Sequence, residues 1–165
     1  MIKSNLPLMI KNVTCAVTGH RTVSEDFDFE KLKKDLEKII QSGYSYFLTG
    51  MAQGFDLLCF NALLSLKEKY SQIKICAVIP CLDQSKYYNY SEKANYQNLL
   101  SQADFVASEE RTYFKGCMLL RNNFLIDNCS LLYAYFNGVK SGGTYYTINR
   151  ANKNSIKVIY YGETK

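Results

Sequence analysis

Short apolar segments alternate along the chain with longer segments in which apolar residues recur at helical spacing. In the clearest helical segment the apolar residues form one continuous stripe, made of Phe55, Leu58, Cys59, Ala62, Leu63 and Leu66. The short apolar segments predict strands near residues 13–18, 44–49, 73–79, 104–107, 130–136 and 156–161. The segments between them predict helices over residues 29–40, 55–66, 91–101, 115–128 and 144–152.

This alternation predicts an α/β fold. Consecutive strands joined by helices pair in parallel through right-handed crossovers, which place helices on both faces of the sheet. We therefore expect a Rossmann-like, doubly wound, mostly parallel sheet. The chain shows no repeat, linker or low-complexity segment, so residues 1–165 are expected to form one domain. Ligands of such sheets bind at the carboxyl ends of the strands, which makes the residues after each strand the informative ones.

Composition narrows the possible classes of protein. Hydrophobic residues make up 47% of the 165 residues and charged residues 21%, as in a folded domain. No apolar run approaches the ~20 residues of a membrane span, and the first 11 residues are too broken for a signal peptide, so we expect a cytoplasmic protein without a membrane partner. The net charge of +5 is modest, and acids are mixed among the lysines, which indicates a solvated surface rather than a DNA groove.

The cysteine pattern does not favour a metal site. The six cysteines form no Cys-x-x-Cys pair, and His20 is the sole histidine of the sequence. The cysteines lie mostly in apolar segments and are expected to be small buried hydrophobes: Cys15, Cys59, Cys76, Cys81, Cys117 and Cys129. We predict no structural metal and no cofactor.

The first predicted strand is followed by Gly19, His20 and Arg21. Gly19 allows a sharp backbone turn, after which His20 and Arg21 project from the rim of the sheet. A guanidinium in that position can grip a phosphate bidentately. The alternative is a surface ion pair between Arg21 and Glu25 or Asp26.

The second predicted strand leads through Thr49, Gly50 and Gly54 into the clearest helix. This loop resembles a glycine-rich phosphate loop, although its spacing is neither Gly-x-Gly-x-x-Gly nor the Walker form. The start of the helix offers free N–H groups to an anion. Asp56 lies at that start, where it either stabilises the helix dipole or faces a ribose hydroxyl.

The fifth predicted strand is followed by Ser141, Gly142, Gly143 and Thr144, at the start of a helix. Closely spaced backbone N–H groups and two hydroxyls suit a phosphate cradle. The alternative is a plain turn in which Thr144 caps the helix.

Two further features interrupt apolar or regular segments. A helical arginine is usually solvated, but Arg121 and Asn122 interrupt an apolar helical run, so an inward-facing role is the alternative. The tyrosine-rich loop at 87–90 is either exposed, a subunit contact, or a surface on which bases stack.

Taken together, these segments resemble the SLOG superfamily, which unites the DprA/Smf, LONELY GUY (LOG) and YpsA-like proteins, and the YpsA-like branch most. The resemblance rests on Thr18-Gly19-His20-Arg21, Gly54-Phe55-Asp56, Pro80, Ser101-Gln102-Ala103-Asp104, Arg121-Asn122 and Gly142-Gly143-Thr144. It implies a Rossmann-like sheet with a nucleotide or nucleotide-derived ligand at the glycine-rich loops. It also implies self-association, so a homodimer is expected.

The LOG branch implies an alternative function, the hydrolysis of nucleoside monophosphates at the N-glycosidic bond. LOG proteins join a Met-x-x-Arg helix, matched by Met118 and Arg121, to a glycine-rich loop that a glutamate follows closely. Here Tyr145 follows Thr144 and the glutamate is missing. A carboxylate would stabilise the cationic sugar of that reaction, so a hydrolase would need Asp56 and Arg121 as catalytic residues.

The DprA branch implies a third function, binding of single-stranded nucleic acid. The sequence has no tryptophan and no dense stripe of Lys and Arg, so it favours this role less. The leading prediction is a YpsA-like domain that binds, and thereby senses or sequesters, a nucleotide-type ligand.

Overall fold

The computed structural model describes residues 1–7 and 10–163. Its strands are β1 (Thr14–Thr18), β2 (Tyr46–Thr49), β3 (Lys74–Ile79), β4 (Phe105–Ser108), β5 (Leu131–Ala134) and β6 (Lys157–Tyr160). Its helices are the short 3-10 turn η1 (Lys11–Val13) and the α-helices α1 (Phe29–Gln41), α2 (Phe55–Lys67), α3 (Tyr90–Ser101), α4 (Cys117–Asp127) and α5 (Gly142–Lys153). The expected domain also included residues 8–9 and 164–165, which lie outside the described residues.

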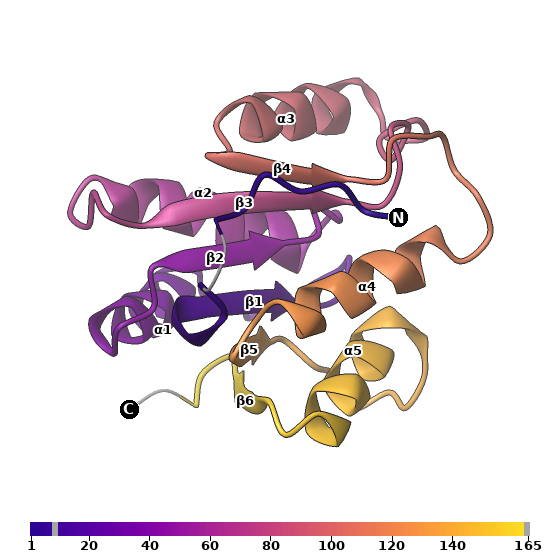
Figure 1. Ribbon diagram of the computed structural model, residues 1–165. Coiled ribbons are helices and arrows are strands. Elements are labelled where there is room, and N and C mark those ends of the chain that lie inside the picture. Colours follow the sequence, from indigo (N-terminus) through magenta and orange to yellow (C-terminus); the bar gives the residue numbers. More distant parts are fainter. Residues whose placement is uncertain (8–9, 164–165) are drawn as a thin grey trace.

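The strands form one six-stranded sheet in the order β4-β3-β2-β1-β5-β6, and every neighbouring pair is parallel. The chain therefore winds outward from β1 to β4, crosses back, and adds β5 on the other side of β1 (Figure 1). This confirms the predicted doubly wound, Rossmann-like fold. The strand order reverses between β1 and β5, and the loops after these two strands diverge there and leave a crevice.

Both faces of the sheet are covered, which explains why the strands are apolar throughout rather than alternating. On one face Val17 of β1 packs in the same core as Leu36 of α1 and Leu63 of α2. On the other, Ala16 packs in the same core as Leu125 of α4 and Ile148 of α5. Figure 1 shows α4 and α5 together on this second side, with their first turns toward the carboxyl edge of the sheet.

The ends of some helices differ from the prediction because of their caps. The helix expected to begin at residue 115 begins at Cys117, because Gly116 adopts a left-handed conformation with φ of 90°. The helix expected to begin at Ser91 has Asn89 as its N-cap. The Asn89 side chain accepts a hydrogen bond from the Glu92 N–H, and the Glu92 side chain accepts one from the Asn89 N–H. The helix expected to begin at Thr144 begins at Gly142, so Thr144 is not its cap.

All six cysteines are buried and unpaired, as predicted. Within the described residues, no group of three or more His, Cys, Asp or Glu side chains is arranged to hold a metal ion. A search of the same residues for a helix of sufficient length and apolarity to span a membrane finds none.

Candidate functional site

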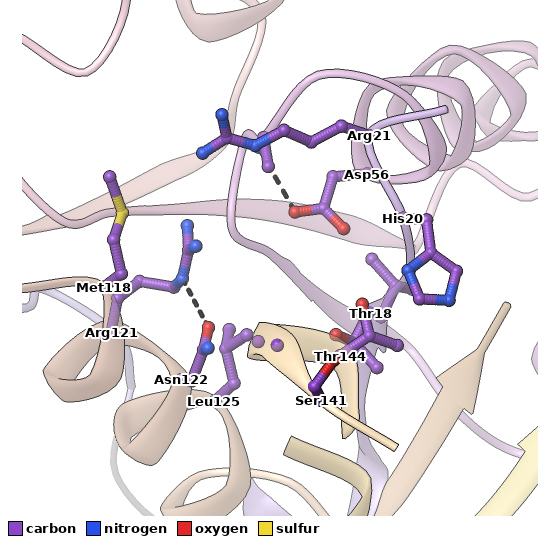
Figure 2. Close-up of a pocket in the computed structure, with 15 residues that line it drawn as sticks. Thr18, His20, Arg21, Asp56, Met118, Arg121, Asn122, Leu125, Ser141 and Thr144 are labelled. Carbon is purple, nitrogen blue, oxygen red and sulfur yellow. Dashed lines mark hydrogen bonds between the residues drawn. The ribbon is translucent and has the colours of Figure 1, made fainter. Parts of the chain in front are cut away.

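A cavity of about 340 Å³ opens where the strand order reverses (Figure 2). Its lining comes from the ends of β1, α2, α4 and α5: Val17, Thr18, Gly19, His20, Arg21, Ala52, Asp56, Met118, Arg121, Asn122, Leu125, Ser141, Gly142, Gly143 and Thr144. Segments more than 120 residues apart in the sequence thus share one concave surface at the carboxyl ends of β1 and β5.

The start of α5 forms one wall of the cavity. Its N-cap, Ser141, makes no side-chain capping bond, and the first turn carries no acidic residue. The first N–H groups of a helix have no partner within the helix, so they are available to a ligand. Gly142 has φ of 89°, and a Cβ built on Gly143 would meet Asn122 Nδ2 at 3.5 Å. A Cβ on Gly142 would meet no heavy atom within 4 Å, so its backbone conformation rather than crowding favours glycine there.

Asp56 supplies a buried carboxylate on the opposite wall. Its side chain is 6% exposed. Oδ2 accepts a hydrogen bond from the Ala52 N–H over 3.2 Å, whereas Oδ1 has no partner among the described residues. Figure 2 shows the carboxylate of Asp56 between Arg21 and Thr18, and Oδ1 itself is buried. Burial raises the pKa of Asp56 to about 6, against the opposing influence of the Arg121 charge and the Ala52 bond.

Arg121 places a buried guanidinium at the same cavity. It is 7% exposed, and burial lowers its pKa, although a guanidinium stays charged in proteins. Nε donates to Asn122 Oδ1 over 2.8 Å, and Nη1 donates to the carbonyl of Gly50. The described residues form no ion pair with it. Its charge is therefore directed at the cavity without a carboxylate bound to it.

His20 connects the loop after β1 to the loop after β5, where the strand order of the sheet reverses. Its Nε2 accepts a hydrogen bond from the backbone N–H of Asn137 over 3.1 Å, and its ring stacks on Phe136 at 5.9 Å. Burial lowers the pKa of the imidazole, and an accepting Nε2 requires the neutral ring. Arg21 follows at the exposed rim, where the described acids Glu25 and Asp26 form no ion pair with it.

Most of the predicted site residues line this cavity: Gly19, His20, Arg21, Asp56, Arg121, Asn122, Ser141, Gly142, Gly143 and Thr144. Three of them do not, namely Thr49, Gly50 and Gly54. Three N–H groups near them are bonded within the protein: Met51 donates to Thr49 Oγ1, Ala52 to Asp56 and Phe55 to the His20 carbonyl. These three groups are not free to bind a phosphate, and a phosphate cradle at residues 49–54 stays a prediction.

Gly54 and Gly19 instead let two loops approach closely. A Cβ on Gly54 would lie 2.5 Å from the His20 carbonyl oxygen, and its φ of 84° suits glycine. A Cβ on Gly19 would lie 2.5 Å from the ring of Phe55. These glycines bring the loop after β1 against the start of α2, which sets the position of Asp56.

The prediction omitted several lining residues. Met118 and Leu125 lie three residues before Arg121 and three after Asn122, so helical spacing places all four on one face of α4. That periodicity was a usable signal. Thr18 and Ala52 belong to the loops already singled out, but neither residue type by itself indicates a ligand.

The family is shown by comparison with known proteins. A family model described as the YspA SLOG family (YpsA) matches residues 28–163. The chain belongs to the YpsA SLOG family. The match confirms the predicted superfamily and its YpsA-like branch.

Similar proteins support this assignment. The chain is 28% identical to a UPF0398 protein of Bacillus pumilus over 79% of its own length and 72% of that protein's. It is 26% identical to the UPF0398 protein YpsA of Bacillus subtilis, over 74% and 69% of the two chains.

Two solved structures share the fold. DNA processing protein A of Helicobacter pylori, described by its single-stranded DNA binding mode, aligns with a TM-score of 0.70 and 18% identity, over 96% of this chain and 70% of its own. DNA processing protein A of Streptococcus pneumoniae aligns with a TM-score of 0.68 and 21% identity, over 92% of this chain and half of its own.

Proposed function

We propose that this YpsA-family domain binds a nucleotide or a nucleotide-derived phosphate in the cavity between β1 and β5. The first turn of α5, with Ser141, Gly142, Gly143 and Thr144, holds the phosphate through its free N–H groups. Arg121 adds its buried positive charge to the same anion.

One observation carries the proposal. Asp56 lines the cavity, and its Oδ1 is buried with no hydrogen-bond donor among the described residues. A buried acceptor without a partner costs roughly 1–3 kcal/mol, more when charged, unless a ligand or water satisfies it. A ribose hydroxyl is a suitable donor. In a nucleotide, the same ribose carries the phosphate that the start of α5 would hold.

Calorimetry of the full chain at pH 7.5 with AMP, GMP, CMP and UMP tests the proposal. We expect binding of at least one of them. Loss of both ribose hydroxyls, as in 2′,3′-dideoxy-AMP, should weaken AMP binding about tenfold or more, because a hydrogen bond to a charged group contributes ~1.5–3 kcal/mol. The Asp56→Asn variant should discriminate much less between the two ligands. Absence of binding by all four ribonucleotides contradicts the proposal.

Hydrolysis of the N-glycosidic bond is a second candidate, and the pKa of Asp56 favours it. A carboxyl whose pKa is about 6 can exchange a proton near neutral pH, as a general acid or base must. Asp56 is also the one acidic residue in the cavity lining formed by the described residues. Release of free base from AMP by wild type, abolished in Asp56→Asn, would establish an enzyme; unchanged AMP after prolonged incubation leaves a binding domain.

Nucleic-acid binding is a third candidate, supported by the fold shared with the two DNA processing proteins. A labelled oligonucleotide that binds at physiological salt and competes with AMP would favour it. A homodimer also remains a prediction, which sedimentation of the purified chain tests.

A further inference from the structure

A second cavity, of about 500 Å³, adjoins the first, because Arg21 and Met118 line both. Its other walls come from the loops after β3 and before α4 and include Tyr87, Tyr88 and Tyr113. We infer that this tyrosine cavity holds the base of the nucleotide whose phosphate lies against α5. The inference rests on the proposed function and adds the position of the base and the residues that hold it.

The two cavities differ in the side chains that a flat ring can contact. The first cavity has a single ring in its lining, His20, which is already stacked on Phe136. The tyrosine cavity presents Tyr87 and Tyr113, which are 89% and 62% exposed. Bases stack on exposed aromatic rings regardless of their identity, whereas the polar first cavity suits a phosphate and a sugar.

Tyr88 gives the tyrosine cavity a fixed inner wall. It is half-buried, and its ring packs edge-on against Tyr96 of α3 with centroids 5.7 Å apart. Lys86 lies over the ring of Tyr87, 5.4 Å from its centroid, so one side of that ring is already covered. A base would therefore meet one half-buried ring, that of Tyr88, and the uncovered side of one exposed ring, that of Tyr87.

Hydrogen-bonding groups of the same wall are already bonded within the protein. Gln84 Nε2 donates to the Gly50 carbonyl over 2.9 Å, and Gln84 Oε1 accepts from the Tyr96 hydroxyl over 2.8 Å. Asp83 Oδ1 accepts from the Tyr113 N–H over 2.6 Å. These bonds hold the two side chains in place, while Gln84 Nε2 keeps a second N–H and Asp83 keeps a second oxygen for the edge of a base. We expect stacking on the tyrosines to favour purines over pyrimidines, because purines offer more area.

The Gly50 carbonyl connects the two cavities. It accepts from Gln84 in the wall of the tyrosine cavity and from Arg121 in the first cavity. Both side chains are thereby held to one backbone atom. The Gly50 carbonyl therefore fixes the position of Gln84, in the wall that would meet the base, relative to Arg121, whose charge would meet the phosphate.

The test compares AMP with ribose 5-phosphate, which lacks the base, by calorimetry on the full chain. Wild type should bind AMP more tightly than ribose 5-phosphate. The Tyr87→Ala/Tyr113→Ala variant should lose about tenfold or more in AMP affinity, since base stacking on one aromatic side chain accounts for about fivefold to over a hundredfold. Its affinity for ribose 5-phosphate should stay unchanged, and Tyr87→Phe/Tyr113→Phe should keep wild-type AMP binding.

Tyr90 provides the matched control. It is 93% exposed and lies outside both cavities, so Tyr90→Ala should change neither affinity. If wild type and the double alanine variant bind AMP equally well, the base does not lie in the tyrosine cavity, while the proposed phosphate site stands. If wild type binds neither ribose 5-phosphate nor any of AMP, GMP, CMP and UMP, both the inference and the proposed function are wrong.

Discussion

Arg121 occupies the space in which a side chain of residue 50 would lie. A Cβ on Gly50 would come within 2.7 Å of the Arg121 Cζ, and the Gly50 carbonyl accepts a hydrogen bond from Arg121 Nη1. Residue 50 is therefore a glycine because α4 places a buried guanidinium against the loop after β2. The Gly50 carbonyl thereby helps to position Arg121 at the site.

The Gly50→Ala substitution should displace Arg121 while the fold survives, because the displaced group is the end of a flexible side chain. We expect a loss of about 1–3 kcal/mol in the free energy of unfolding, as for other overpacked sites. AMP affinity should fall about tenfold or more, since the charge-assisted contact is lost. Denaturant unfolding and calorimetry measure the two effects. Wild-type AMP affinity in this variant would show that Arg121 does not depend on Gly50.

The Asp56→Asn substitution should change how stability depends on pH. Asp56 has a pKa of about 6 in the folded chain, above its ordinary value of 3.8. The protonated form is therefore favoured by folding, so this group's stabilising contribution is complete below pH ~4 and is lost as the pH rises through about 6. Each pH unit between the two pKa values corresponds to about 1.4 kcal/mol, which gives roughly 3 kcal/mol in all.

Without ligand, wild type should thus lose stability between pH ~4 and ~6 relative to Asp56→Asn, and the variant should be the more stable protein at pH 7. Urea unfolding of both proteins at pH 4, 5, 6 and 7 measures the difference. A constant difference across this range would mean that the carboxyl has the same pKa in the folded and unfolded chain.

The Gly143→Val substitution should block the cavity and leave the fold intact. The Cβ meets only Asn122 Nδ2, at an ordinary contact distance of 3.5 Å, and the further methyl groups extend into the space that the α5 start borders. We expect AMP affinity to fall at least about tenfold, with little loss of stability, because valine has a higher helix propensity than glycine. Gly143→Ala is the matched control, expected to bind more tightly than the valine variant. Equal AMP binding by wild type and Gly143→Val would exclude this turn from the site.

The fold was predictable because its signals are local. The apolar stripe of α2 and the β-branched segment of β1 follow from residue spacing alone, and helices between strands require parallel pairing. The helix ends were less predictable. Helix α4 begins only after Gly116, because Gly116 has a left-handed backbone conformation. Glycine permits this conformation but does not require it, so the sequence did not predict it.

For the site, the sequence identified the loops but not the role of each glycine. Gly50 and Gly143 look alike in the sequence, since both follow a strand in a glycine-containing loop. Gly143 lines the cavity, whereas Gly50 lies under Arg121. The difference depends on α4, whose packing against the sheet brings Arg121 to residue 50 across 71 positions of sequence.

The sequence by itself determined the order of strands and helices, the burial of both sheet faces and the set of loops that meet at one edge, because hydrophobic spacing and chain connectivity control these. Only the tertiary structure decided which N–H groups after β2 are bonded, which oxygen of Asp56 lacks a partner among the described residues and which cavity carries the tyrosines. These properties depend on contacts between segments far apart in the chain, where a shift of about one ångström makes or breaks a hydrogen bond.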